Sequence, residues 1–484
     1  MRTIIINRLA TTLRHCGAPT LLLASAAVGA SDAHEYVVNV DANLEQMRIE
    51  AHFATPVNDV SARSGAASRF LDDARDCDSN EALANRGRRF SIPRRGISCI
   101  SYSVDLQQAA AAERRNDTLS PQNIVVSPAV WLWHPPINSR SRIIVQFVLE
   151  GDTVASVPWP PIDSHDHSYE VVPSPRNAKA MAAFGRFIYS EEQIPGTRLR
   201  IALLRPRGEI DSATIIDWVR DTAGNVGLAY GRFPNPSPHI VVLPVGRSGW
   251  QGDSPVPFGR VLRDGGDSVE LFIDERRPIE DFYDDWTATH EFSHLMLPFV
   301  RSPHRWISEG FAQYYQNVLL TRAGQYDERR AWQKLYEGFE RGRKSRPELS
   351  PNEAAERGVE AATMKIYWSG AIIALLADVE LRQRSDGRES LDFALDRLQR
   401  CCLPAATSWS GTQLFEKLDS FVTQPVFMPL YDQYADARGF PDIVPIFERL
   451  GVEVANDRVS LRDDAELTEI RRAITEIYSA ASKE

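Results

Sequence analysis

Residues 290–315 read HEFSHLMLPFVRSPHRWISEGFAQYY and combine an H-E-x-x-H motif with a second glutamate, Glu309, after fourteen intervening residues. Residues four apart on an α-helix lie one above the other on the same face, so His290 and His294 can both direct an imidazole nitrogen toward one metal ion. Glu291 points slightly off that axis, where its carboxylate can reach a water on the metal and act as general base. The motif therefore predicts one catalytic zinc ion held by a helix.

A catalytic zinc site usually has three protein ligands and one open position, so a third ligand is expected. Glu309 is the best candidate, because the run WISEGFAQYY at 306–315 reads as the start of a second helix with an aromatic face that can pack against the first. Two helices that cross there would leave the fourth zinc position open for water and substrate.

The same residues allow other interpretations. A buried amphipathic helix whose histidines only form hydrogen bonds is the structural alternative. The metzincin pattern H-E-x-x-H-x-x-G-x-x-H would need glycine and histidine where the chain has Leu297 and Val300. His304 lies nearby but out of register, and we interpret it as a loop histidine. We favour the zinc site because histidine is scarce in this chain, with 10 residues in 484.

The motif and its glutamate resemble the gluzincins, and within them the glycyl aminopeptidases of family M61, which in turn are similar to the M1 aminopeptidases. A second segment, 366–398, begins IYWSGAIIALLADVELR and resembles the helix that opens with Y-x-K-G in these families. The resemblance implies that Tyr367 stabilises the transition state and that Gly370 takes the glycine position, whereas Ser369 stands where lysine is usual. It covers residues 185–455 well and the N-terminal part loosely.

The resemblance also implies a thermolysin-like catalytic domain in which a strand upstream of the zinc helix runs along the cleft and pairs with the substrate backbone. Residues 259–263 or 268–272 are the candidates. The chain lacks the G-A-M-E-N run of M1 and the G-L-E-H run of M61, which help to hold a free amino terminus. Aminopeptidase specificity therefore stays open. The segment after Val454 is too short for the PDZ domain that many M61 relatives append.

The fold class predicted for the chain is α+β. Residues 31–188 contain short alternating runs, such as ISCISYSVDL from position 97, which predict a β-sandwich-like domain. Residues 189–455 mix strands and helices and form the thermolysin-like, mainly helical catalytic domain. Residues 456–484 are expected to be a C-terminal helical tail. The apolar run 371–377 is followed by charged residues, so we expect a core helix instead of a membrane span.

Aromatic and histidine-rich segments of the N-terminal part have simpler explanations than ligand binding. Trp131, Trp133 and Trp159 are expected in the core, although a surface platform for ligands is the alternative. The run DSHDH at 163–167 has metal-ligating residue types, but a polar turn after WPP explains it more simply.

Charge and composition exclude some classes of partner. A chain of 484 residues with 43 % hydrophobic residues is long enough for two or three domains with sizeable cores. The net charge is −10, and without residues 1–30 the chain has 52 basic against 65 acidic residues. This acidic balance argues against a nucleic-acid partner and against docking on anionic lipid.

Residues 1–30 are typical of a secretory signal peptide. Arg2, Arg8 and Arg14 form a positive n-region, residues 18–28 form an apolar h-region too short to span a bilayer, and small residues precede a cleavage site after Ala30 or Ala33. An uncleaved N-terminal anchor or a disordered leader is the alternative. We predict an exported protein, periplasmic or secreted, with no membrane span in the mature chain.

Export makes disulfides possible for the four cysteines that follow the signal segment. We predict a bond between Cys77 and Cys99, because both lie in one predicted domain and would close a polar, arginine-rich loop. Adjacent Cys401 and Cys402 are either free thiols or a bonded pair. Metal binding by cysteine is not expected, since no C-x-x-C spacing occurs.

These observations predict an exported zinc-dependent peptidase that hydrolyses peptide bonds with a metal-activated water and a glutamate general base. A peptide or protein is the expected substrate. The rival hypothesis is a catalytically inactive gluzincin-fold binding or scaffold protein. The absence of the runs that hold a substrate's amino terminus favours this rival, as does Ser369 in the place of lysine. The complete H-E-x-x-H motif with Glu309 favours the enzyme. The sequence carries no signal for an oligomeric state.

Overall fold

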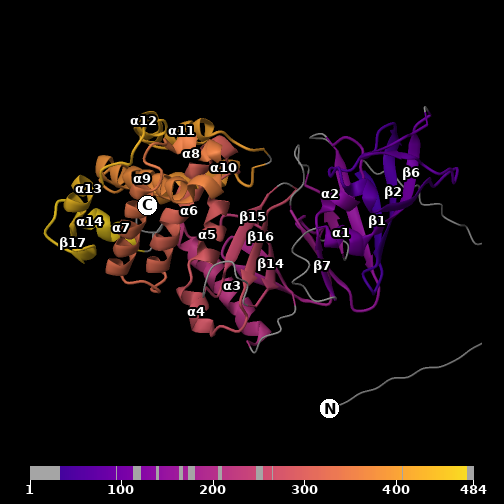
Figure 1. Cartoon of the computed structure of the whole chain (residues 1–484), viewed down its shortest axis with the longest axis horizontal. Coiled ribbons are helices and arrows are strands. Elements are labelled where there is room, and N and C mark those ends of the chain that lie inside the picture. The colour runs from indigo at the N-terminus through magenta and orange to yellow at the C-terminus, as the bar shows by residue number, and fades with distance from the viewer. Residues whose placement is uncertain are drawn as a thin grey trace, which may run out of the picture.

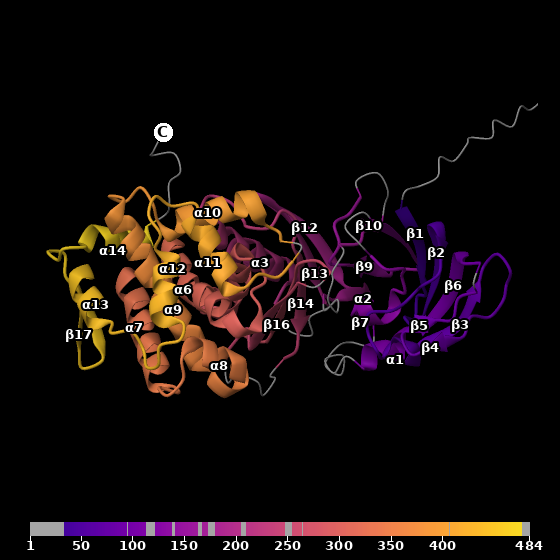
Figure 2. The same ribbon diagram turned by 90° about the horizontal axis from the view of Figure 1, so that it is seen from above.

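The computed structural model describes residues 33–476, except 94, 113–121, 138–140, 163–166, 173–179, 205–209, 247–253, 264 and 406. The predicted signal peptide and most of the DSHDH run lie outside the described residues. The β-rich N-terminal part lies at one end of an elongated molecule, the helices lie at the other end, and a five-stranded sheet lies between them (Figures 1 and 2). The predicted α+β class is confirmed.

Two sheets form the N-terminal part. The larger sheet has the strand order β10-β8-β1-β2-β6-β3, in which β1 and β8 are parallel and the other neighbours antiparallel. Its strands are β1 (Ala33–Val40), β2 (Gln46–Val57), β3 (Leu71–Asp76), β6 (Ile97–Asp105), β8 (Arg142–Leu149) and β10 (Ser168–Glu170). The smaller sheet consists of β7 (Asn123–Val126), β11 (Ala182–Gly185) and β9 (Val154–Ser156).

The smaller sheet is buried on both faces. Side chains alternate along a strand, so Ile124 and Val126 of β7 join the core of the larger sheet, whereas Val125 faces the central five-stranded sheet. Trp131, Trp133 and Trp159 are at most 1 % exposed, as expected for core residues. The cores on the two faces of β7-β11-β9 therefore connect the N-terminal part to the rest of the chain.

Short elements complete this part. They are the hairpin β4 (Asn85–Arg86) and β5 (Arg89–Phe90), and the helices α1 (Leu106–Ala111) and α2 (Pro128–Trp131). Cys77 and Cys99 are disulfide-bonded, as predicted. Cys401 and Cys402, whose state the sequence left open, are bonded to each other.

The central sheet has the strand order β12-β13-β14-β16-β15. Its strands are β12 (Ile188–Ile194), β13 (Thr197–Leu203), β14 (His239–Pro244), β15 (Phe258–Leu262) and β16 (Ser268–Ile273). The inner strands β13, β14 and β16 are parallel, and helix α3 (Ser212–Val226) connects β13 to β14. β15 pairs antiparallel with β16 and forms one edge of the sheet.

Helices form the C-terminal part. They are α4 (Ile279–Asp284), α5 (Thr287–Ser293), α6 (Arg305–Arg322), α7 (Glu328–Lys344), α8 (Pro351–Arg357), α9 (Val359–Arg384), α10 (Leu391–Cys402), α11 (Gly411–Asp419), α12 (Phe427–Tyr434), α13 (Val444–Leu450) and α14 (Thr468–Thr475). In the described chain, α9 alone is long and apolar enough to cross a membrane. Its apolar run is buried against neighbouring helices, which is the behaviour of a core helix.

The expected helical tail is partly wrong. β17 (Val452–Ala455) and β18 (Arg458–Leu461) form an antiparallel hairpin before the short helix α14. Ile474 of α14 is fully buried, and Arg471 donates to the carbonyls of Leu450, Gly451 and Arg462. The segment is therefore packed into the helical core.

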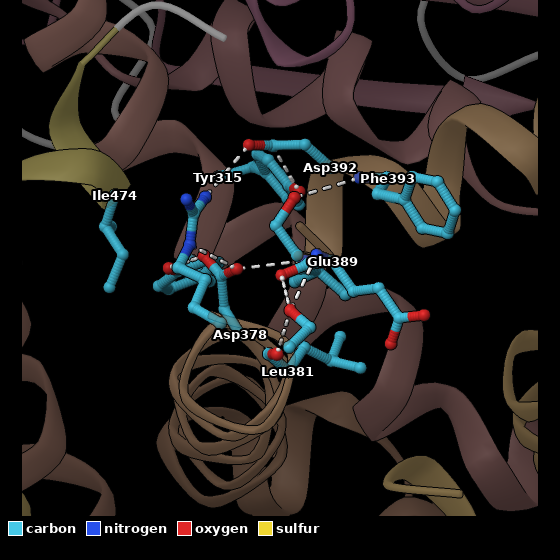
Figure 3. Close-up of polar contacts among 12 residues, drawn as sticks. Tyr315, Asp378, Leu381, Glu389, Asp392, Phe393 and Ile474 are labelled. Atoms are coloured by element: carbon cyan, nitrogen blue, oxygen red, sulfur yellow. Dashed lines mark hydrogen bonds and ion pairs between the residues drawn. The ribbon is translucent and has the colours of Figure 1, made fainter. Parts of the chain in front are cut away.

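A buried ion-pair network joins α6, α9 and α10 (Figure 3). Arg322 donates to both carboxylate oxygens of Asp392, at 3.1 and 2.8 Å, and Arg382 bridges Asp378 and Asp392. The hydroxyls of Tyr314 and Tyr315 donate to Asp378 and Asp392. Two arginines balance two aspartates, so burial leaves no uncompensated charge. The network fixes the helices that carry the candidate site.

Candidate metal centre

Helix α5 and the 3-10 turn after it (His294–Met296) carry the H-E-x-x-H residues, and α6 carries Glu309. The Nε2 atoms of His290 and His294 lie 3.5 and 3.4 Å from the same oxygen of Glu309. Ligand atoms around a tetrahedral zinc ion, at about 2 Å from it, are separated by about 3.3 Å. The structure therefore brings the three predicted ligands together at a spacing that fits zinc.

Hydrogen bonds orient both imidazoles. Nδ1 of His290 lies 2.9 Å from the amide oxygen of Gln316, and Nδ1 of His294 lies 3.1 Å from the hydroxyl of Ser308. Because an amide oxygen only accepts, Nδ1 of His290 carries the proton and leaves Nε2 free as a ligand atom. Sequence reasoning missed Gln316 and Ser308. Gln316 follows Glu309 by two helical turns, a spacing that places both on one face of α6.

The electrostatics at Glu309 favour its charged form. Burial alone would raise the pKa of this carboxyl, but the adjacent imidazoles of His294 and His290 outweigh burial and lower the pKa below its usual range. An ionised carboxylate is the form that binds a metal.

The pKa of Glu291 shifts in the opposite direction, and its side chain lies under the edge strand β15. Burial raises the pKa of its carboxyl, and the charges of His294 and His290 only partly oppose that effect. Gly259 of β15 is so close that a Cβ atom there would lie 2.5 Å from Cγ of Glu291. Glycine at this position allows the edge strand to pass directly over the predicted general base.

Tyr367, predicted only through the family resemblance, also lies at the site. Its ring stacks on His290, with centroids 5.6 Å apart and planes 7° from parallel. Burial, the charges of Glu309 and Glu291, and a hydrogen bond to Glu309 raise the pKa of the phenol, so its oxygen keeps the proton.

A close crossing of α6 and α9 places Glu309 beside Tyr367. A Cβ atom on Gly310 would lie 2.1 Å from Cα of Gly370, and one on Gly370 would lie 1.9 Å from the carbonyl oxygen of Trp306. Only glycine at both positions lets the two backbones approach this closely. The crossing explains why glycines follow Glu309 and Tyr367 so closely in the sequence.

Other residues singled out in the sequence are not part of the cluster. His304 packs against Tyr431, with ring centroids 6.0 Å apart. Ser369 is buried, and its hydroxyl has no hydrogen-bond partner among the described residues. A second group of metal-ligating types, Glu50, His52 and Cys99, includes a disulfide-bonded sulfur, so it offers no thiolate.

Comparisons with known proteins found one matching family model and several similar folds. The family model "M61 glycyl aminopeptidase" matches residues 298–373, a segment that contains Glu309 and Tyr367. No curated protein matches the sequence. An aminopeptidase N family protein from Idiomarina loihiensis has a similar structure, with a TM-score of 0.56 and 13 % identity over 91 % of this chain and 78 % of that chain.

Two further solved structures are similar. A two-domain M1 zinc metallopeptidase mutant bound to L-arginine has a TM-score of 0.50 and 12 % identity over 85 % of this chain and 94 % of that chain. An M1 zinc metallopeptidase from Deinococcus radiodurans has a TM-score of 0.49, with 12 % identity over 85 % of this chain and 94 % of that chain.

The chain therefore resembles the class of the zinc metallopeptidases in its fold, in a cluster of side chains that could hold a metal ion and in the segment that matches the family model. Within that class, its predicted resemblance to the M61 glycyl aminopeptidases, and more distantly to the M1 family, is confirmed.

Proposed function

We propose that this chain is an exported peptidase that hydrolyses peptide bonds at a zinc ion held by His290, His294 and Glu309, in a thermolysin-like catalytic fold. One observation carries the proposal: both histidine Nε2 atoms face the same Glu309 oxygen at nearly equal distances, with Glu291 and Tyr367 alongside. When bound, zinc supplies a Lewis acid that acidifies water and polarises a carbonyl group.

Glu291 is the proposed general base. It takes a proton from the attacking water and delivers it to the leaving nitrogen. Its raised pKa suits the first step, because it makes the carboxylate a stronger base toward the attacking water than an ordinary carboxylate. The hydroxyl of Tyr367 keeps its proton and donates a hydrogen bond to the oxygen that becomes negative in the transition state.

The edge strand is the proposed substrate guide. β15 ends the central sheet and passes over Glu291 at Gly259, so an extended peptide that adds to this edge lies across the catalytic carboxylate. Arg263 donates to the carbonyls of His294 and Leu297, which ties the segment after β15 to the turn that carries the second histidine. The candidate 259–263 from the sequence therefore suits this role better than 268–272, which belongs to the inner strand β16.

Two features support the proposal that the chain is exported. Residues 1–30 have the composition of a signal peptide, and an oxidising compartment permits the bond between Cys77 and Cys99.

The test combines metal analysis with a peptide-library digest, with and without a chelator. We expect one zinc per chain and cleavage that the chelator abolishes. Glu291→Gln should retain zinc and lose cleavage, because the amide cannot accept a proton. His290→Ala should lose both. Full zinc content without cleavage of any peptide would support the inactive scaffold instead.

A further inference from the structure

A pocket of about 300 Å³ lies beside the candidate metal centre, between α6, α7, the first turns of α9 and Trp286. Three of its lining residues also contact His290. Trp286 packs edge-on against the imidazole, Tyr367 stacks on it, and Gln316 hydrogen-bonds its Nδ1 atom. The pocket is large enough for a substrate side chain or chain end. The imidazole of His290 therefore contacts both the pocket wall and the predicted metal position.

The α6 wall of the pocket is polar although it is buried. Gln313, Gln316 and Asn317 are 7, 5 and 1 % exposed. The amide oxygen of Gln316 accepts a hydrogen bond from Nδ1 of His290, and Nδ2 of Asn317 donates to the backbone oxygen of Gln313 at 3.0 Å. The side-chain amide of Gln313 forms no hydrogen bond with any described residue. A buried amide usually has a partner, so this one is placed to bind a polar group in the pocket.

The α7 wall contributes two cations, Lys334 and Arg341. Neither forms an ion pair with a carboxylate in the described part of the chain. Nζ of Lys334 lies 5.5 Å from the ring centre of Tyr326, and Cζ of Arg341 lies 5.2 Å from that of Trp368. In contrast, Arg343 and Lys344 near the end of the same helix both pair with Glu340.

The lining includes one carboxylate, Glu337, whose Oε1 accepts a hydrogen bond from Gln333 at 3.0 Å. Two cations against one anion leave the pocket with an excess positive charge. This charge and the amide of Gln313 suit a carboxylate and disfavour a protonated amine.

We propose that this pocket binds a carboxylate of the peptide substrate, either an aspartate or glutamate side chain or the C-terminal carboxylate. The inference rests on the proposed peptidase function and adds a substrate class to it. Lys334 and Arg341 attract the carboxylate, Gln313 donates to it, and Trp286 and Trp368 pack against the adjoining methylene groups. The substrate extends from the edge strand across the metal centre, with its acidic group on the α7 side.

The experiment uses matched fluorogenic peptides and the zinc-loaded full chain. One arm compares glutamate with glutamine at each position, and a second arm compares a free C-terminus with an amidated one. We expect kcat/KM to be at least about tenfold higher for the acid than for its amide in one of the two arms, since a hydrogen bond to a charged group is worth about that factor. The arm that shows the preference identifies the source of the carboxylate.

The double variant Lys334→Met with Arg341→Met should remove this preference. Arg343→Met with Lys344→Met is the matched control, because it removes the same charge from the same helix outside the pocket and should keep the preference. Equal kcat/KM for acid and amide in both arms, or a preference that survives loss of Lys334 and Arg341, would overturn the pocket assignment. A requirement for a free amino terminus that depends on Glu337 would also overturn it.

Binding to the zinc-loaded Glu291→Gln variant separates this inference from the proposed function. Intrinsic tryptophan fluorescence, to which Trp286 and Trp368 of the pocket contribute, should change on titration with the acidic peptide at about tenfold lower concentration than with its amide. If no peptide is cleaved by the wild-type chain but this difference persists, the peptidase proposal fails and the pocket assignment stands. If peptides are cleaved and the difference is absent, the pocket assignment fails alone.

Discussion

Tyr367 differs from the other site residues because its ring and its hydroxyl have separate roles. The ring stacks on His290 and the hydroxyl lies near Glu309 and Glu291. Tyr367→Phe keeps the stacking and removes only the oxygen. We expect kcat to fall by roughly 10²–10³ while zinc content and KM change little, because one oxyanion donor contributes about that factor. Steady-state kinetics and metal analysis check this. Turnover within about threefold of wild type would make Tyr367 a packing residue only.

We expect Gln316 to affect metal binding through its contact with His290. Gln316→Leu removes the acceptor at Nδ1, so the imidazole loses its fixed tautomer and orientation. We expect zinc affinity to fall by about 10–100-fold, measured by competition with a chromogenic chelator. Gln316→Glu offers a carboxylate acceptor of similar shape and should retain tight binding. Unchanged affinity in Gln316→Leu would show that packing by Tyr367 and Trp286 alone orients the ring.

The sequence could predict residues whose chemistry depends on local spacing. His290, Glu291 and His294 lie on consecutive turns, so helix geometry alone brings them together. Gln316 and Ser308 were missed, because a glutamine or serine on a helix is compatible with many roles and its partner lies elsewhere in the chain. Lys334 and Arg341 were missed for a related reason: an unpaired cation is visible only when the surrounding carboxylates are placed.

Among the elements, helices α6 and α9 cross too closely to admit one further carbon atom at Gly370. Gly370→Ala places a Cβ atom 1.9 Å from the carbonyl oxygen of Trp306, so the helices must separate and carry Glu309 away from Tyr367. We expect a loss of about 1–3 kcal/mol in the free energy of unfolding, together with reduced kcat. Urea denaturation and kinetics measure both.

Gly224→Ala in α3 is the matched control, because a Cβ atom there meets nothing within 4 Å. Alanine has the higher helix propensity, so this variant should be neutral or slightly stabilising. If both variants had the same free energy of unfolding and the same kcat, the α6–α9 crossing would tolerate a methyl group.

Element types and some boundaries were predictable, but sheet order was not. The hairpin β15–β16 follows from alternation around a turn, whereas its place at the sheet edge depends on β14 pairing with β16 across an intervening segment. The C-terminal tail was predicted to be helical. Its helix α14 is present, but the prediction missed the hairpin before it, because β17 and β18 are each only four residues long, too short for periodicity to show.

For the whole molecule, polar contacts across the boundary between the N-terminal part and the central sheet supplement the apolar core. Arg200 of β13 is 1 % exposed and donates to the backbone oxygens of Val157 and Trp159, at 2.8 and 2.9 Å. His239 of β14 is fully buried between the hydroxyls of Ser156 and Ser268, at 2.8 and 2.9 Å. Two side chains of the central sheet thus bind the end of β9 and the segment that follows it. No sequence pattern indicates this contact between distant segments.

The burial of His239 predicts how stability depends on pH. Burial, and then the charge of Arg200, lower the pKa of this imidazole well below its ordinary value, so it stays neutral in the folded chain. Below about pH 6.5 the unfolded chain binds a proton at this position that the folded chain does not bind, so the free energy of unfolding falls as pH falls. This contribution to stability is complete above pH 6.5 and is lost progressively below it. The loss by pH 5 is about 2 kcal/mol for this one group.

His239→Gln tests the prediction, because glutamine can hydrogen-bond both serine hydroxyls without titrating. Urea unfolding at pH 7.5 and pH 5, with a chelator present so that zinc release does not contribute, should show a smaller difference for the variant by about 2 kcal/mol. His134, whose pKa burial lowers to about 4, remains in both proteins and contributes equally to both differences. The same pH difference in wild type and variant would show that His239 becomes protonated in the folded chain, and that the contact between β14 and β9 opens to admit water.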